Sequence, residues 1–178
     1  MTDIKKPKIN FGGTMKKYEF TGKEKVVFGT KLMQIRSLVS IEKIGVKPGE
    51  IGGWIEKETN LDHAGGAWVS GEAQVSGGAR VSGEAQVSGE ARVFGGARVS
   101  GEARIEKTEE YLMIGPIGSR NAILTSWKGE NRVMVSTGCF LGSIDEFAKA
   151  VKDKHGETEF GKQYEDALKY ISRKFKVK

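Results

Sequence analysis

The chain has 178 residues and a formal net charge of +6. This length fits one domain or a few small modules, no apolar run approaches the ~20 residues that span a bilayer, and the start of the sequence lacks the apolar core of a secretory signal. We therefore expect a cytosolic protein that contacts no membrane, with its single cysteine, Cys139, as a reduced and buried thiol.

The positive charge is concentrated at the two ends of the chain. Residues 1–62 hold 12 Lys and Arg against 8 Asp and Glu, and residues 143–178 hold 9 against 7, whereas the middle is neutral. We interpret residues 1–16 as a flexible basic tail, in preference to a nucleic-acid patch, because basic clusters are common. The lysines that we expect to be solvated in this tail and directly after it are Lys5, Lys6, Lys8, Lys16 and Lys17.

Residues 17–50 follow with strand-like segments, KYEF, KVVFG and LMQIRSLVSI, and with KPGE as a turn. We expect them to form a β cap on the segment that comes next. Residues 51–68 fill three degenerate hexapeptide slots, 51–56, 57–62 and 63–68. Trp54 and Trp68 are expected to pack within the cap and the first repeats, and stacking on a ligand is the alternative.

Six hexapeptides without an insertion fill residues 69–104, each opening on Val with Gly third and Ala fifth. Ala and the Val two residues later share one side of a short strand, which we expect to face inward. Residues 69–86 and 87–104 match at 15 of 18 places, so each residue should lie against the one eighteen positions away. The valines expected inside are Val69, Val75, Val81, Val87, Val93 and Val99.

This pattern resembles the hexapeptide-repeat superfamily of left-handed parallel β-helices. The resemblance implies a mainly β fold in which residues 51–106 form a left-handed parallel β-helix of about three coils. Segments 52–71 and 111–147 are similar to a phage and prophage subgroup, which implies a phage protein acting in the host cytosol. It supplies no site residue.

One face of the repeat should be bare, because Gly77 and Gly78 lie beneath Gly95 and Gly96. Related β-helices assemble as trimers, so we expect a homo-oligomer, a trimer, packed through this face. A solvated corner at which Gly and Glu interchange is the alternative. The expected contact residues are Gly78, Gly96, Phe94, Arg80 and Arg98.

Residues 107–178 predict an α+β module of three strands and two helices. Residues 143–146 are a capping box that opens the first helix, which ends at Gly156, and the second helix begins near Glu159. The apolar stripes at helical spacing are expected to be core. They comprise Ile144, Phe147, Ala148 and Val151 in the first helix, and Tyr164, Ala167, Leu168, Ile171 and Phe175 in the second.

The loop before the first helix suggests an anion site, because a helix start offers free amides and Arg120 could approach it as a bidentate donor. The alternatives are that Ser143 is only the helix cap and that Arg120 pairs with Glu130 or Asp145. The candidate ligand-binding residues are Arg120, Ser119, Thr137, Gly138, Gly142 and Ser143.

Catalysis is the less favoured function. Hexapeptide acyltransferases use a histidine as general base, and this chain has only His63 and His155. We expect no cofactor and no metal. The favoured interpretation is a non-enzymatic oligomer that antagonises host defence by holding a small phosphorylated ligand, a nucleotide signal, or by covering a host defence protein. A virion or tail component is the rival.

Overall fold

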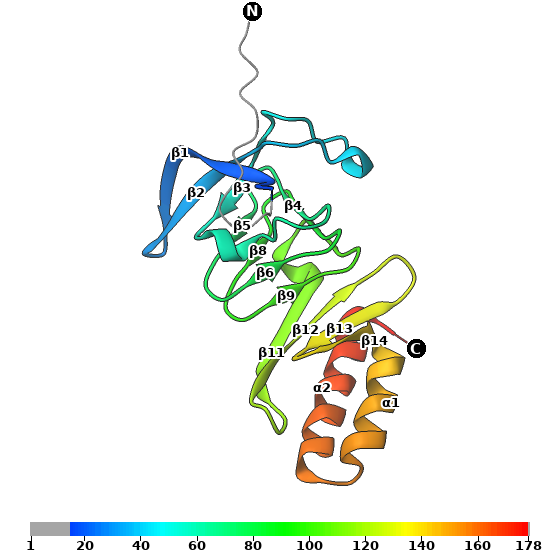
Figure 1. Cartoon of the computed structure of the whole chain (residues 1–178). Helices are drawn as coiled ribbons and strands as arrows, with labels where there is room; N and C mark the ends of the chain where they lie inside the picture. Colours follow the sequence, from blue (N-terminus) through cyan, green and yellow to red (C-terminus); the bar gives the residue numbers. More distant parts are fainter. Residues whose placement is uncertain (1–14, 178) are drawn as a thin grey trace, which may run out of the picture.

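The computed structural model describes residues 15–177. Figure 1 shows three parts in chain order, with long antiparallel strands at one end, the repeat in the middle, and a second antiparallel sheet with two helices at the other end. The strands up to the end of the repeat are β1 (Tyr18–Val27), β2 (Thr30–Ser37), β3 (Ile51–Ile55), β4 (Trp68–Val69), β5 (Gln74–Val75), β6 (Arg80–Val81), β7 (Gln86–Val87), β8 (Arg92–Val93), β9 (Arg98–Val99) and β10 (Arg104–Ile105). The elements after it are β11 (Tyr111–Ile117), β12 (Ala122–Lys128), β13 (Val133–Thr137), β14 (Phe140–Ser143), α1 (Ile144–His155) and α2 (Glu159–Phe175), and short 3-10 turns lie at Glu42–Ile44, Glu58–Asn60 and Thr108–Glu110.

The strands belong to four separate sheets, so the left-handed parallel β-helix that we predicted is wrong as the fold class. One sheet is mixed (β1-β2-β3-β5-β8), one is antiparallel (β11-β12-β13-β14), and two small parallel sheets contain β10-β7-β4 and β6-β9. The repeat forms strands of only two residues, whereas the long strands at both ends pair antiparallel through hairpins. The chain is therefore mainly β, with two helices.

The predicted eighteen-residue offset is confirmed within the repeat. Gln74 pairs with Arg92, Arg80 with Arg98 and Gln86 with Arg104, all in parallel. The repeat valines and alanines are fully buried and form one apolar column. Burial of these side chains stabilises the middle of the molecule, by ~25 cal/mol per Å² of apolar surface removed from water.

The residues that enter the repeat follow a different register from the one that we predicted. Ile55 and Leu61 pair with residues twenty positions later, and the offset of eighteen begins at Trp68 and Val69. Ile51, which we placed at the first inward position, is half exposed, and Ile55 is buried instead. Trp54 and Trp68 are buried, as expected for packing residues.

Lys17 and Tyr18 cover the first layer of the repeat. We had expected Lys17 to be solvated, and we had given Tyr18 no role. Lys17 is 3% exposed, and its Nζ donates to the carbonyl oxygens of Ala67 at 2.7 Å and Gly65 at 3.3 Å. The hydroxyl of Tyr18 donates to the carbonyl of Leu61 at 3.0 Å. Burial lowers the pKa of Lys17 from its ordinary 10.5 to about 8. Lys16 pairs with Glu58, whereas Lys5, Lys6 and Lys8 lie outside the described residues.

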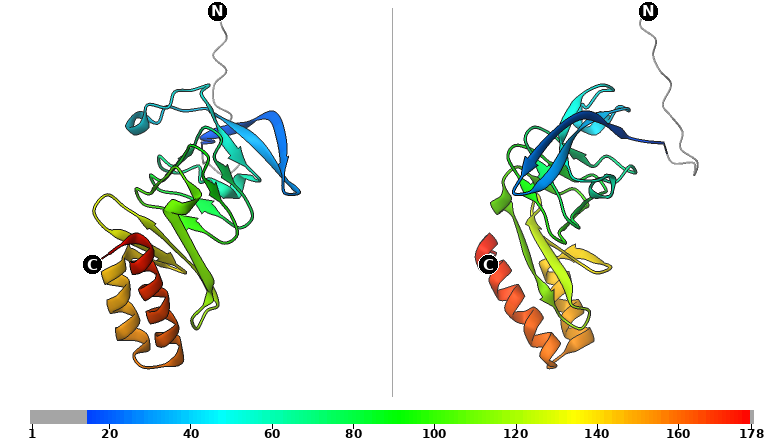
Figure 2. Two further views of the ribbon diagram at one scale, coloured as in Figure 1. Left: turned by 180° about the vertical axis from the view of Figure 1, so that it is seen from behind. Right: turned by 90° about the vertical axis from the view of Figure 1, so that its left-hand side faces the viewer.

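One face of the C-terminal sheet packs on the last layer of the repeat, and the other face packs on the two helices. The views in Figure 2 show both helices on one side of this sheet. Tyr111 and Trp127 join the core of the repeat, while Leu124 and Val135 pack with the helices. This part has four strands, where we predicted three.

Both predicted helices are present. Ser143 and Glu146 form the expected capping box of α1, which ends at Gly156. Ala148, however, is exposed. Within residues 15–177, no helix is long and apolar enough to cross a membrane.

Candidate functional site

The hairpin between β13 and β14 separates two cavities. On one side, an open groove of about 540 Å³ runs along the repeat face that contains β6 and β9, from Glu58 and Asp62 to the hairpin. On the other side, a pocket of about 280 Å³ lies between the hairpin and α1. Gly138, Cys139 and Phe140 at the hairpin tip line both cavities.

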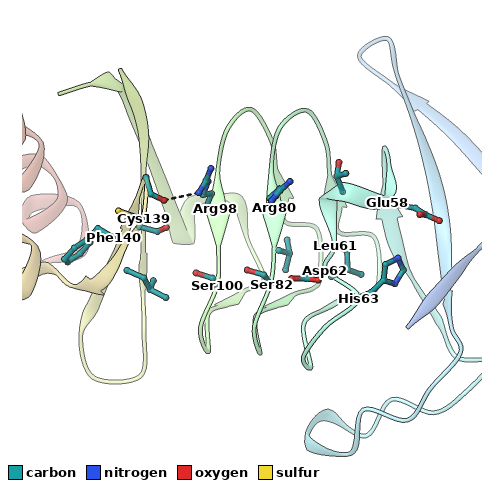
Figure 3. A pocket seen from close by; sticks show the side chains of 15 residues that line it. Glu58, Leu61, Asp62, His63, Arg80, Ser82, Arg98, Ser100, Cys139 and Phe140 are labelled. Carbon is teal, nitrogen blue, oxygen red and sulfur yellow. Dashed lines mark hydrogen bonds between the residues drawn. The ribbon is translucent and has the colours of Figure 1, made fainter. Parts of the chain in front are cut away.

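Figure 3 shows the groove, with Arg80 and Arg98 on neighbouring strands and Ser82 and Ser100 in the same relation farther along. Both arginines are exposed. The guanidinium Nη1 of Arg98 donates to the carbonyl of Gly138 at 3.0 Å. This bond joins the repeat face to the hairpin tip.

The bare face that we predicted for contacts between subunits is partly covered by the chain itself. A Cβ on Gly96 would lie 2.8 Å from Cγ1 of Ile123, which belongs to β12. The missing side chain therefore allows close approach of the C-terminal sheet, rather than of a second copy. Gly78 and Phe94 are exposed, and Arg80 and Arg98 line the groove.

The pocket combines an aromatic wall with a cationic rim. Ring centroids lie 5.1 Å apart for Phe140 and Phe147, 5.5 Å for Phe147 and Tyr164, and 5.5 Å for Tyr164 and His155. Arg120 and Lys154 line the same space. Such a surface suits a ligand with a flat apolar part and a negative charge.

The structure brings together four of the six predicted ligand-binding residues and separates the other two from them. Ser119, Arg120, Thr137 and Gly138 line the pocket, and Gly142 and Ser143 do not. At the start of α1, the Glu146 carboxylate accepts the backbone N–H of Ser143 at 2.7 Å, and the Ser143 hydroxyl accepts the N–H of Glu146 at 3.2 Å. The start of α1 is occupied by these capping hydrogen bonds. The prediction that Arg120 approaches this helix start to form an anion site is therefore wrong.

Arg120 instead faces Cys139, with Nη1 3.8 Å from Sγ. Cys139 is exposed, so our expectation of a buried thiol is wrong. The hydrogen bond and charge of Arg120 hold the pKa of the Cys139 thiol below its ordinary value, and Lys154 adds to this effect. Gly138 has φ +56°, a left-handed conformation that suits glycine and that turns the chain at this tip.

The two histidines lie in different places. His63, at the groove, stacks on Tyr18, and its Nδ1 accepts the backbone N–H of Lys17 at 3.2 Å. Burial lowers the pKa of His63, which favours the neutral ring. His155 lines the pocket.

Sequence reasoning missed Lys154 and the aromatic wall because their side chains come from separate elements. The helical stripes identified Phe147 and Tyr164 as core, which is confirmed because both are buried, but did not show that they also line a pocket. The spacing of α1 could have shown Lys154 close to Val151, but nothing in the sequence placed the hairpin tip against them.

Comparison of the sequence with protein-family models and with curated proteins gave no match. The resemblance to the hexapeptide-repeat superfamily and its phage subgroup is therefore not supported as a family assignment, and the separate mixed and antiparallel sheets contradict the fold that it implied.

Proposed function

We propose that the protein binds a small phosphorylated ligand with a flat ring system, of the nucleotide class, in the pocket between the β13–β14 hairpin and α1. The observation that carries this proposal is the placement of Arg120 and Lys154 at the rim of a cavity walled by Phe140, Phe147 and Tyr164. Phe140, the partly exposed ring of the three, would contact the apolar part of the ligand. The two cations would bind its phosphate.

The proposed activity is stoichiometric capture without turnover. Arg120 and Lys154 supply the binding, and the proposal assigns no general base. Capture of a nucleotide signal is the role that such binding would serve. The alternative roles, covering a host protein, a virion component or an acyltransferase, draw on no feature of this pocket.

Calorimetry of the full chain with a panel of linear and cyclic nucleotides tests this proposal. At least one nucleotide should bind, and Arg120→Ala should weaken it by about 10- to 100-fold, the value of a lost charge-assisted contact. Arg173→Ala, which removes an exposed arginine of α2, is the matched control and should bind as the wild type does. Uniform absence of binding heat would contradict the proposal.

We also propose that the protein associates with itself. Phe28 and Phe94 are 92% and 47% exposed and line a hollow of about 910 Å³, which supports a contact surface there. Aromatic side chains are frequent anchors of protein interfaces. Light scattering should give a trimer, and the double variant Phe28→Ser with Phe94→Ser should shift it towards monomer. A monomeric wild type would contradict this proposal.

Finally, we propose that the protein works in the cytosol. Its lone Cys139 is exposed and its thiol pKa is lowered, and such thiols persist in reducing compartments.

A further inference from the structure

The stacked repeats place like charges opposite one another, and one acidic pair is bridged by a lysine. Glu84 and Glu102 occupy equivalent places in neighbouring layers, and Lys43 Nζ lies 3.9 Å and 3.0 Å from their carboxylate oxygens. Glu72 is paired with Lys25 at 2.7 Å. Lysines of the N-terminal part therefore pair with three of the four glutamates of the repeat.

The arginine pair of the repeat has no such bridge. Arg80 and Arg98 are direct partners in the β6–β9 ladder, where strands lie about 4.8 Å apart. Like charges placed directly opposite in a ladder repel. Within residues 15–177, the one hydrogen bond made by either guanidinium is that of Arg98 with the Gly138 carbonyl.

The other two faces of the repeat avoid this arrangement. There, a glutamine stands opposite each arginine, with Gln74 opposite Arg92 and Gln86 opposite Arg104. Only the face that lines the groove puts two arginines together. The two carboxylates of the groove are already engaged, because Glu58 pairs with Lys16 at 2.6 Å and Asp62 accepts the backbone N–H of Ala64 at 3.0 Å.

We propose that Arg80 and Arg98 form a second anion site, which binds the diphosphate group of a ligand lying in the groove. Two guanidiniums one strand spacing apart can each bind one of two linked phosphates. The hydroxyls of Ser82 and Ser100 line the same groove as further donors. At about 540 Å³ the groove leaves room for the rest of such a ligand. This site does not depend on the function proposed for the pocket.

Inorganic pyrophosphate is the probe, titrated into the full chain at constant ionic strength. The wild type should bind it, and Arg80→Gln should weaken binding by about 10-fold or more. Glutamine is the residue that the other two faces carry at this place, so the substitution suits the fold. Arg104→Gln removes the same charge on another face and should leave binding unchanged.

Thermal unfolding at low ionic strength gives a second measurement. Without pyrophosphate, Arg80→Gln should raise Tm, because it removes the repulsion between the two guanidiniums. At the same concentration, pyrophosphate should raise the Tm of the wild type more than that of Arg80→Gln.

Three results would overturn the proposal: a wild type that does not bind pyrophosphate, equal loss of binding in Arg80→Gln and Arg104→Gln, or loss in Arg120→Ala with Arg80→Gln unaffected. The last result would place pyrophosphate in the pocket instead. Failure of nucleotides to bind the pocket would leave the pyrophosphate result unchanged, so the two proposals can fail separately.

Discussion

The hydroxyl of Thr125 accepts the backbone N–H of Arg98 at 3.0 Å. In earlier layers, the equivalent N–H groups donate to carbonyls of the next layer, as Arg80 does to Ala97 at 2.9 Å. Arg98 has no next layer, so a side chain of the C-terminal sheet takes the place of the missing strand. Thr125 is fully buried, and water cannot replace its hydroxyl.

We predict that Thr125→Val destabilises the protein by about 1 to 3 kcal/mol, the cost of leaving a buried donor without a partner. The two side chains have nearly the same shape, so the loss reports the hydrogen bond. Chemical denaturation of the full chain measures it. Thr108→Val is the control, because Thr108 accepts the N–H of Arg92 in the same way but is exposed to water. Equal losses in the two variants would contradict this account.

We predict that Val87→Asp unfolds the repeat. Val87 is fully buried between Val69 and Ile105, its partners in the neighbouring layers. An uncompensated buried charge costs about 3 to 5 kcal/mol, a large part of the total stability of a domain. Gln86→Glu adds a carboxylate one residue away on the outer side and should keep the wild-type melting curve. A Val87→Asp protein that melts as the wild type does would disprove the inward assignment.

The sequence predicts best where one interaction repeats. Val and Ala recur at fixed places, so periodicity alone identified the buried column and the offset of eighteen. The boundaries of α1 were predictable for a similar reason, since the cap at Ser143 and the stop at Gly156 are local signals. The register of the degenerate segment 51–68 was predicted wrongly because Ile51 and Ile55 are both apolar, and only packing against β2 decides which one is buried.

The fold class and the candidate site depend on contacts between distant residues. The repeat contributes short strands, and the hairpins at its two ends determine the larger sheets, so the assignment of residues 51–106 to one left-handed parallel β-helix was wrong. Lys17 looked solvated because its partners, the carbonyls of Ala67 and Gly65, are fifty and forty-eight residues away. Arg120 was assigned to a helix start that Glu146 already occupies.

We predict that stability rises as the pH is raised from 8 to about 9, below the range in which the raised pKa values of the buried Tyr18 and Tyr111 act in the opposite direction. Burial lowers the pKa of Lys17 to about 8 in the folded protein, whereas the unfolded chain keeps the ordinary 10.5. Between these values the unfolded state binds more protons, so raising the pH favours folding. Denaturation at several pH values measures the slope. Lys17→Met should flatten it and lower the stability at neutral pH, because the carbonyls of Ala67 and Gly65 lose their donor. A slope that persists in Lys17→Met would assign the effect to another group.

We predict that Cys139 is alkylated unusually fast and that Arg120 is the cause. The guanidinium lies 3.8 Å from Sγ and lowers the pKa of the thiol, so more of the reactive thiolate is present at neutral pH. Iodoacetamide should react several-fold more slowly with Arg120→Gln, and the midpoint of the rate against pH should move upward. Cys139 is the only cysteine of the chain, so every label reports this site. Arg132→Gln changes an exposed arginine in the β12–β13 turn and should react as the wild type does.

The same reaction also reports occupancy, because Cys139 lines the pocket: a nucleotide that binds between Arg120 and the aromatic wall should slow alkylation in proportion to the fraction bound. A nucleotide that binds by calorimetry but leaves the rate unchanged would have to bind elsewhere, and the pocket would lose its proposed function.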